Sequence, residues 1–161
     1  MIIITKYSQE EKDGKKYIRS EEVSLCPICH SVLKVIGSRE RTAIEADGNK
    51  QIFVIRRLRC KDCGHVHHEL PDLLVPFKRH CAETIEQVVS GGEPVSPLGK
   101  PTIRRIRNWW TEVSQYFLNI LRTLEARHGV KLSASLKTSE IVRAVVNSHF
   151  WIHTRSVRMS E

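Results

Sequence analysis

The amino-acid sequence predicts an α+β protein in which a small β-rich part, residues 1–76, is followed by an all-α part, residues 77–161. Three observations support this class. Short β-type runs with polar turns fill the first part, proline-punctuated residues 67–76 end it, and apolar residues then recur at helical spacing. A chain of 161 residues is long enough for one ordinary domain or two small ones.

Two β-hairpins are expected in residues 1–76, because Asp-Gly pairs at Asp13 and Asp47 supply the positive φ that tight turns require. The flanking strands are expected at residues 2–7 and 16–23 for the first hairpin and at residues 42–46 and 51–58 for the second. Residues 67–76 are expected to form an extended linker, because residues that precede proline avoid the helical region.

Two C-x-x-C pairs, separated by 30 residues, carry the most specific pattern in the chain: Cys26, Cys29, Cys60 and Cys63. Each pair forms a tight knuckle, and the second hairpin brings the knuckles together so that four sulfurs surround one tetrahedral zinc ion. Such a site has no open position for water, so the Zn²⁺ is expected to be structural and not catalytic. An iron–sulfur centre and a redox use of one pair are the alternatives.

Four histidines lie near these cysteines in the sequence, and one of them could replace a cysteine as ligand: His30, His65, His67 and His68. We expect that none does, because four thiolates already saturate the metal. The fifth cysteine, Cys81, falls on the apolar side of the next helix and is expected to be a buried structural thiol.

The formal net charge of +8 favours partners that are rich in phosphate. Residues 1–25 are neutral, whereas residues 26–80 (ten basic minus six acidic) and 81–161 (eleven minus seven) each carry +4. The apolar run at Ile2 is too short for a signal peptide, and no window approaches the roughly 20 apolar residues of a membrane span. A cytoplasmic protein is therefore expected.

Three helices are expected in the second part, at residues 79–89, from Thr102 as N-cap to about residue 128, and at residues 139–148. The middle helix has an apolar stripe that advances by three and four residues: Ile103, Ile106, Trp110, Val113, Phe117, Ile120 and Leu124. The stripe predicts a helix that faces the core, with a dimerising coiled coil, and hence a homodimer, as the alternative.

The start of this middle helix is basic, and its polar side chains outside the stripe are candidate contacts to DNA: Lys100, Arg104, Arg105, Arg107, Asn108 and Thr111. Basic residues of the second hairpin and of the segment after it extend the set: Arg56, Arg57, Arg59, Lys78 and Arg79. A helix, a glycine break and a second capped helix have the layout of a helix-turn-helix, although the connection is longer than usual. A merely solvated basic face is the alternative.

Five runs of the chain carry a resemblance to a known family: Cys26 to Cys29, Leu33 to Arg39, Ile55 to Cys60, His67 to Asp72 and Pro76 to His80. In these runs the chain resembles an uncharacterised bacterial zinc-ribbon family, found mainly in Firmicutes. The layout is similar to the N-terminal zinc-ribbon and helix-turn-helix region of insertion-sequence transposases. The resemblance implies DNA binding, with zinc held by the four matching cysteines. His30 departs from it, because such knuckles usually place glycine there.

These observations together predict a small β-rich zinc ribbon followed by an all-α helix-turn-helix-like region. The expected function is that of a zinc-stapled DNA-binding protein, either a regulator or a transposase-related accessory. No enzyme activity is expected, because a closed four-cysteine site has no open position for water and because transposase catalysis needs a further domain of roughly a hundred residues or more. The alternative is a zinc-ribbon adaptor that dimerises or docks through residues 103–124.

Overall fold

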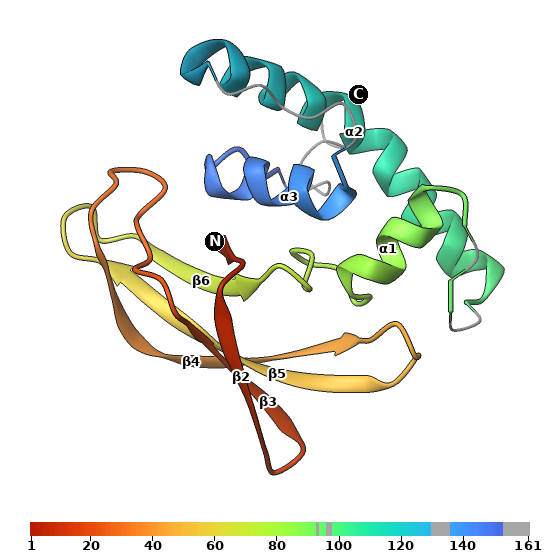
Figure 1. The fold of residues 1–161 in the computed structure, drawn as a ribbon, viewed down its shortest axis with the longest axis horizontal. Coiled ribbons are helices and arrows are strands. Elements are labelled where there is room, and N and C mark those ends of the chain that lie inside the picture. The colour runs from red at the N-terminus through yellow and green to blue at the C-terminus, as the bar shows by residue number, and fades with distance from the viewer. Residues whose placement is uncertain (93, 96–97, 130–135, 153–161) are drawn as a thin grey trace, which may run out of the picture.

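The computed structural model describes residues 1–92, 94–95, 98–129 and 136–152. Six strands form one curled, mixed sheet, and three helices follow it in the chain and cover one of its faces (Figure 1). The elements are β1 (Ile2–Ile4), β2 (Tyr7–Lys12), β3 (Lys15–Ser20), β4 (Leu33–Ile44), β5 (Lys50–Cys60), β6 (Val66–Pro71), α1 (Ala82–Val89), α2 (Lys100–His128) and α3 (Thr138–Asn147). No helix among the described residues is long and apolar enough to cross a membrane.

The predicted small zinc ribbon followed by an all-α helix-turn-helix-like region is wrong, although the class α+β is correct. One cluster of buried side chains joins the sheet to all three helices: it includes Phe53 and Ile55 of β5, Ile85 of α1, Phe117 of α2 and Val145 of α3. The helices therefore bury their apolar sides against the sheet and one another, and do not form a separate bundle.

Strand β5 organises the sheet. One of its edges pairs with β4 in antiparallel fashion along the whole hairpin, from Leu33 opposite Cys60 to Ile44 opposite Lys50. The other edge is shared by two strands. Its first half pairs with β3 in parallel, and its second half pairs with β6 in antiparallel fashion. The hairpin β4–β5 therefore connects the half of the sheet that contains β2 and β3 with the half that contains β6 and β1.

The sequence predicted the hairpin β4–β5 correctly, with a turn at Asp47 and Gly48, although both strands are longer than expected. In the first hairpin the turn at Asp13 and Gly14 is correct, and so is the second strand, because the strand expected at residues 16–23 is β3, which ends at Ser20. Residues 2–4 form the separate strand β1, which pairs in parallel with β6, because three consecutive isoleucines are buried there. The polar residues after Tyr7, expected in a turn, form the exposed strand β2.

The segment expected to be a linker is a central strand. Residues Val66–Pro71 form β6, which lies between β1 and β5. Pro71 ends the strand, where its missing N–H removes no interior bond from the ladder. Leu74 and Val75 follow and are also buried in the core.

Helix α1 begins three residues later than expected, and Gly99 instead of Thr102 caps α2, which begins at Lys100 with Pro101 in its first turn. The fully buried side of α2 consists of Ile106, Trp109, Val113, Phe117 and Leu121. Three members of the predicted stripe belong to it, whereas Trp110 and Ile120 are only partly buried. In α3, which is one residue earlier at each end than the expected helix, the buried apolar residues are Ile141, Val142, Val145 and Val146.

Candidate metal centre and basic surface

The four cysteines of the C-x-x-C pairs converge at one end of the hairpin β4–β5. Cys26 and Cys29 lie in the connection between β3 and β4, Cys60 ends β5, and Cys63 lies in the turn before β6. Their Sγ atoms all lie within 4.8 Å of one another, with 3.6 Å between Cys26 and Cys63 and 3.3 Å between Cys29 and Cys60. Sulfurs at 2.3 Å from a tetrahedral ion would lie about 3.8 Å apart. The four cysteines are therefore positioned to bind a metal ion.

The backbone of the two knuckles supports this convergence. In the first, the N–H of Cys26 donates to the carbonyl of Ser31 and the N–H of His30 donates to the carbonyl of Cys26, both at 2.9 Å. The residue after each second cysteine adopts the left-handed conformation, with φ of +62° at His30 and +73° at Gly64. Gly64 adopts this conformation without strain because it has no Cβ. For His30, which has a Cβ, the same conformation costs about 1–2 kcal/mol of free energy.

The cluster is built into the sheet. Cys26 and Cys60 are fully buried against Ile2, Leu33 and Leu58, which together form a second, smaller apolar core. Cys29 is exposed, and a hydrogen bond from the backbone N–H of Ser31 is the largest of the interactions that lower its pKa to about 6. The end of the molecule that contains the four cysteines, called the metal end below, is thus buried on the side of the sheet and exposed to solvent at Cys29.

Histidine does not enter the converging group, which contains only cysteines among the described residues. His67 lies closest to it: its Nε2 is 3.5 Å from the Sγ of Cys26, and its Nδ1 is 3.4 Å from the amino group of Met1. Burial lowers the pKa of His67 to about 4, so its ring is neutral at neutral pH. A ring protonated on Nε2 donates to the sulfur of Cys26 and accepts from the amino group of Met1, which orients the Cys26 side chain.

A buried carboxylate supports the strand beside the cluster. Glu69 of β6 is 1% exposed, and Arg56 donates to it through Nε at 2.6 Å and through Nη2 at 2.9 Å. The hydroxyl of Ser24 donates to the same carboxylate at 2.5 Å. Arg56, a predicted DNA contact, therefore has its guanidinium bound to Glu69.

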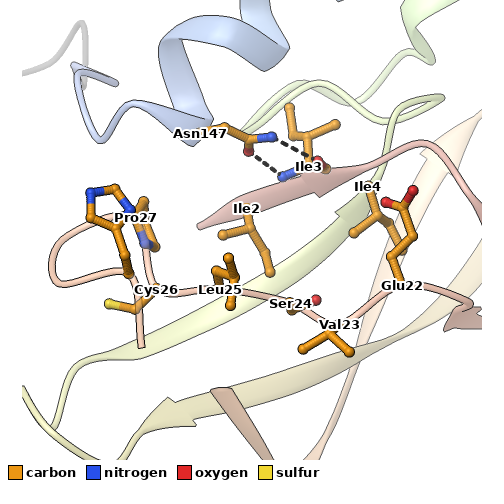
Figure 2. Close-up of a pocket in the computed structure, with 11 residues that line it drawn as sticks. Ile2, Ile3, Ile4, Glu22, Val23, Ser24, Leu25, Cys26, Pro27 and Asn147 are labelled. Atoms are coloured by element: carbon orange, nitrogen blue, oxygen red, sulfur yellow. Dashed lines mark hydrogen bonds between the residues drawn. The ribbon is translucent and has the colours of Figure 1, made fainter. Parts of the chain in front are cut away.

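A pocket of about 280 Å³ lies next to the cluster, between β1, the end of α3 and the segment that leads to Cys26 (Figure 2). Its walls are mainly aliphatic, with Glu22, Ser24, His30 and Asn147 as polar members. Figure 2 shows that Asn147 bonds both backbone groups of Ile3: the Ile3 N–H donates at 2.7 Å and the Ile3 carbonyl accepts at 2.9 Å. These bonds complete the free edge of β1.

A basic face covers the half of the sheet near the metal end. The β4–β5 register sets Lys34 opposite Arg59, Gly37 opposite Arg57 and Arg39 opposite Ile55, so these side chains share the face on which Ile55 enters the core. The β5–β6 register adds His68 opposite Arg57. Among the residues that the structure describes, none of the ion pairs within 4.0 Å involves the basic face, defined here as Lys34, Arg39, Arg57 and Arg59.

Most of the predicted DNA contacts between Lys78 and Asn108 line two separate pockets. Lys78 and Arg79 lie beside Arg39 of the basic face, around a shared pocket, and the Nζ of Lys78 is 4.0 Å from the ring centroid of Trp109. Lys100, Arg104, Arg107 and Asn108 line a separate hollow of about 490 Å³ with Gly91 and Gly92.

The remaining predicted side chains of α2 bond within or next to the helix. The Nε of Arg105 donates to the carbonyl of Pro101 at 3.3 Å, and the hydroxyl of Thr111 donates to the carbonyl of Arg107 at 3.0 Å. Arg105 also lies near His80, whose pKa is lowered by burial and then by this charge.

Four basic residues beside the predicted contacts were not among them: Lys34, Arg39 and Arg41 of β4 and His68 of β6. The alternation of Arg39 and Arg41 within a β-type run was a signal that both share one face.

A sequence profile of one protein family matches residues 26–106, about half of the chain, from the first cysteine of the cluster into α2. Its description, "Domain of unknown function (DUF6431)", names neither a metal nor a partner. No curated protein and no solved structure shows significant similarity to the chain. The chain, with the four cysteines and the basic face inside the matched segment, belongs to the DUF6431 family.

Proposed function

We propose that this chain is a zinc-stapled protein that binds double-stranded DNA through the basic face of its sheet. The observation that carries the proposal is the basic face itself, where Arg39, Arg57 and Arg59 are exposed and form no ion pair with a carboxylate of the described residues. Fixed cations on a sheet attract a polyanion, and each phosphate that they neutralise releases condensed counterions. The proposed mode of binding differs from a helix-turn-helix, because strands and not a recognition helix carry it.

Zinc is the metal that the donor set favours. Four thiolates in a tetrahedral arrangement select zinc or an iron–sulfur cluster, and a closed site with no solvent position is typical of structural zinc. The role proposed for zinc is to hold the end of β5 against β4 and β6, where Arg57 and Arg59 lie.

The metal assignment is tested by metal analysis of the purified protein. About one zinc per chain is expected. The variant Cys60→Ser should lose the metal, because it removes a buried ligand, whereas Cys81→Ser should retain it, because Cys81 lies in the other core. Iron in place of zinc, or zinc retained by Cys60→Ser, would contradict the assignment.

The DNA assignment is tested by the salt dependence of duplex binding. The double variant Arg57→Ala/Arg59→Ala should weaken binding and reduce the slope of log K against log salt by about two, roughly 0.9 for each phosphate that is no longer neutralised. The matched control is Lys6→Ala/Arg19→Ala, whose side chains pair with Glu22 and Glu10. An unchanged slope in the first variant, or the same reduction in the control, would refute the basic face as the DNA-binding surface.

The alternative function, an adaptor that dimerises or docks through residues 103–124, has less support. Ile106, Val113 and Phe117 of the apolar stripe are buried within the chain itself. A partner would have to displace the core to reach them.

A further inference from the structure

The basic face ends in a pocket of about 210 Å³ whose polar lining consists of cations and one histidine. Strands β4, β5 and β6 form its floor, and the segment between β6 and α1 forms its wall. The polar lining residues are Arg39, Arg41, His68, Lys78 and Arg79, and no carboxylate of the described residues lines the pocket. A pocket of this composition is suited to an anion.

The central cation of this pocket is held in place by backbone carbonyls. The Nη2 of Arg41 donates to the carbonyls of Val75 and Lys78, the second at 3.0 Å. Burial, and then the charge of Arg39, lower the pKa of Arg41, which nonetheless remains a cation as arginine does in proteins. A half-buried positive charge whose hydrogen bonds go to neutral carbonyls is costly, and a bound anion would offset that cost.

The neighbouring groups add to the same field. The pKa of His68 is lowered by burial and then by the charges of Arg39 and Arg57, so this ring is surrounded by positive charge. Burial lowers the pKa of Lys78 to about 8, and the charge of Glu112 only partly opposes the shift. At pH 7 a lysine with this pKa is still mainly the ammonium cation, and a bound anion would favour that form further.

An aromatic side chain stands at the rim. Phe77 lines the pocket, is 62% exposed, and adopts a φ of +59°, which a residue with a Cβ rarely does. A large apolar ring held outside the core in an unfavourable conformation indicates a contact surface. Aromatic rings beside a cationic groove are the usual platform on which unpaired bases stack.

The size of the pocket limits what it can enclose. Its 210 Å³ is below the roughly 300–1,000 Å³ of sites that enclose whole small molecules. A phosphate group fits this limit, whereas a nucleotide would have to leave its base outside, next to Phe77. Internal phosphates of a duplex lie on a convex surface, so a concave pocket is better suited to a phosphate that ends a strand.

We propose that this pocket binds the terminal phosphate of a nucleic-acid strand, with the terminal base stacked on Phe77. The inference rests on the proposed binding of DNA and adds a preference for strand ends. The guanidinium groups of Arg39 and Arg79 are the proposed phosphate donors, because both are exposed and line the pocket.

Fluorescence anisotropy with the zinc-loaded full chain tests the proposal. The probes are duplexes of one sequence with a short single-stranded end, labelled internally, that carry a 5′-phosphate, a 3′-phosphate or only hydroxyl ends. A phosphate end should bind about tenfold more tightly than the hydroxyl form. Inorganic phosphate at millimolar concentration should reduce this preference, because it competes for the pocket.

Variants connect the preference to the pocket. Arg79→Ala and Arg39→Ala should remove the preference, whereas Arg59→Ala, outside the pocket, should weaken all probes by the same factor. Phe77→Asn should reduce affinity several-fold without loss of stability, because asparagine tolerates the left-handed conformation that phenylalanine adopts here.

The outcomes separate this inference from the proposed function. Salt-dependent binding that is equal for phosphate and hydroxyl ends would overturn the pocket and leave the basic face as the DNA-binding surface. The absence of binding to every probe would overturn both, and binding of inorganic phosphate alone would overturn the assignment to a strand end. A preference that persists in Arg79→Ala and Arg39→Ala would overturn the location.

Discussion

Glu69 shows how a single buried charge holds the metal end of the sheet together. Its carboxylate accepts from Arg56 of β5 and from Ser24 of the segment that leads to the first knuckle. Ionised groups are expensive to bury, and this one is acceptable because its oxygens have charged or hydroxyl donors. The same bonds connect three parts of the chain: β5, β6 and the cysteine knuckle.

Replacing Glu69 by Gln should therefore lower the free energy of unfolding by about 2–3 kcal/mol, because the amide group is neutral and directs N–H toward donors. Denaturant unfolding measures the decrease. The control Glu40→Gln breaks a pair with Lys15 that lies in solvent, and its effect should be much smaller. Equal decreases in the two variants would show that the hydrogen bonds between Arg56 and Glu69 stabilise the fold no more than a solvent-exposed ion pair does.

Two cysteines should differ sharply in reactivity once the metal is removed. Burial raises the pKa of Cys81 to about 11, so its thiol is protonated at pH 7 and should resist iodoacetamide. Cys29 is exposed, and its pKa of about 6 makes it mostly thiolate at the same pH. Mass spectrometry after brief alkylation at pH 7 should find Cys29 modified before Cys81.

The pH dependence follows from the sign of these shifts. The alkylation rate of Cys81 should rise as the pH approaches 11, since only the thiolate reacts, whereas the rate of Cys29 should level off above about pH 7. Rapid modification of Cys81 at pH 7 in the folded protein would contradict its burial.

At the scale of elements, the bonds between β1 and α3 replace a missing strand. Strand β1 pairs with β6 along one edge only, and Asn147 in the last turn of α3 satisfies the N–H and the carbonyl of Ile3 on the other. An unpaired strand edge invites pairing with another chain. Asn147 occupies that edge with the two groups that a neighbouring strand would have used.

Asn147→Ala should lower stability by about 1–3 kcal/mol, because the backbone of Ile3 is left without both partners. The control is Asn119→Ala on the exposed side of α2, where the change should stay within about 0.5 kcal/mol. Thermal unfolding and light scattering are measured together, since the open edge should also increase self-association. Equal stability of the two variants would contradict the bridging role.

At the scale of the whole molecule, the hairpin β4–β5 contributes to two apolar cores. The smaller core surrounds the cysteines and the larger one lies under the helices, and β5 contributes Leu58 to the first and Phe53 to the second. Each core is supported by a different means. The proposed metal ion would stabilise the small core in addition to the burial of its apolar side chains. The large core is stabilised by side-chain packing.

Removal of the proposed metal by a chelator should therefore affect the two ends unequally. Hydrogen exchange of residues 24–33 and 60–66 should accelerate first, whereas the buried turns of α2 should keep their protection. The measurement is exchange mass spectrometry with and without chelator. A uniform decrease in protection would mean that the metal stabilises the whole fold as one unit.

The sequence alone predicts the parts of this fold that depend on local patterns. The hairpin β4–β5 is recognisable because Asp47 and Gly48 determine its turn, and α3 because its apolar residues recur every three to four positions. Strand β6 is not recognisable, because His67, Glu69 and Pro71 resemble a polar linker until Arg56 is seen to neutralise Glu69. Likewise, adjacent tryptophans in α2 do not reveal which one faces the core.

The candidate sites differ in the same way. The cysteine cluster is predictable, because the C-x-x-C spacing itself encodes two knuckles that need only be brought together. The basic face is not, because a bulge between Val35 and Gly37 shifts the register that sets Arg57 beside Arg39. Sequence periodicity gives the face of a side chain but not its cross-strand neighbour.

The bond between Ile3 and Asn147 also has a consequence for the order of events during synthesis. The two residues are 144 positions apart in the sequence. Strand β1 is therefore synthesised long before α3, which supplies Asn147. Strand β1 has no partner until β6 is made, and its second edge stays open until α3 follows, with three isoleucines not yet covered. Long-range closure of this kind slows folding, and the waiting strand is where a nascent chain of this protein is most vulnerable to aggregation.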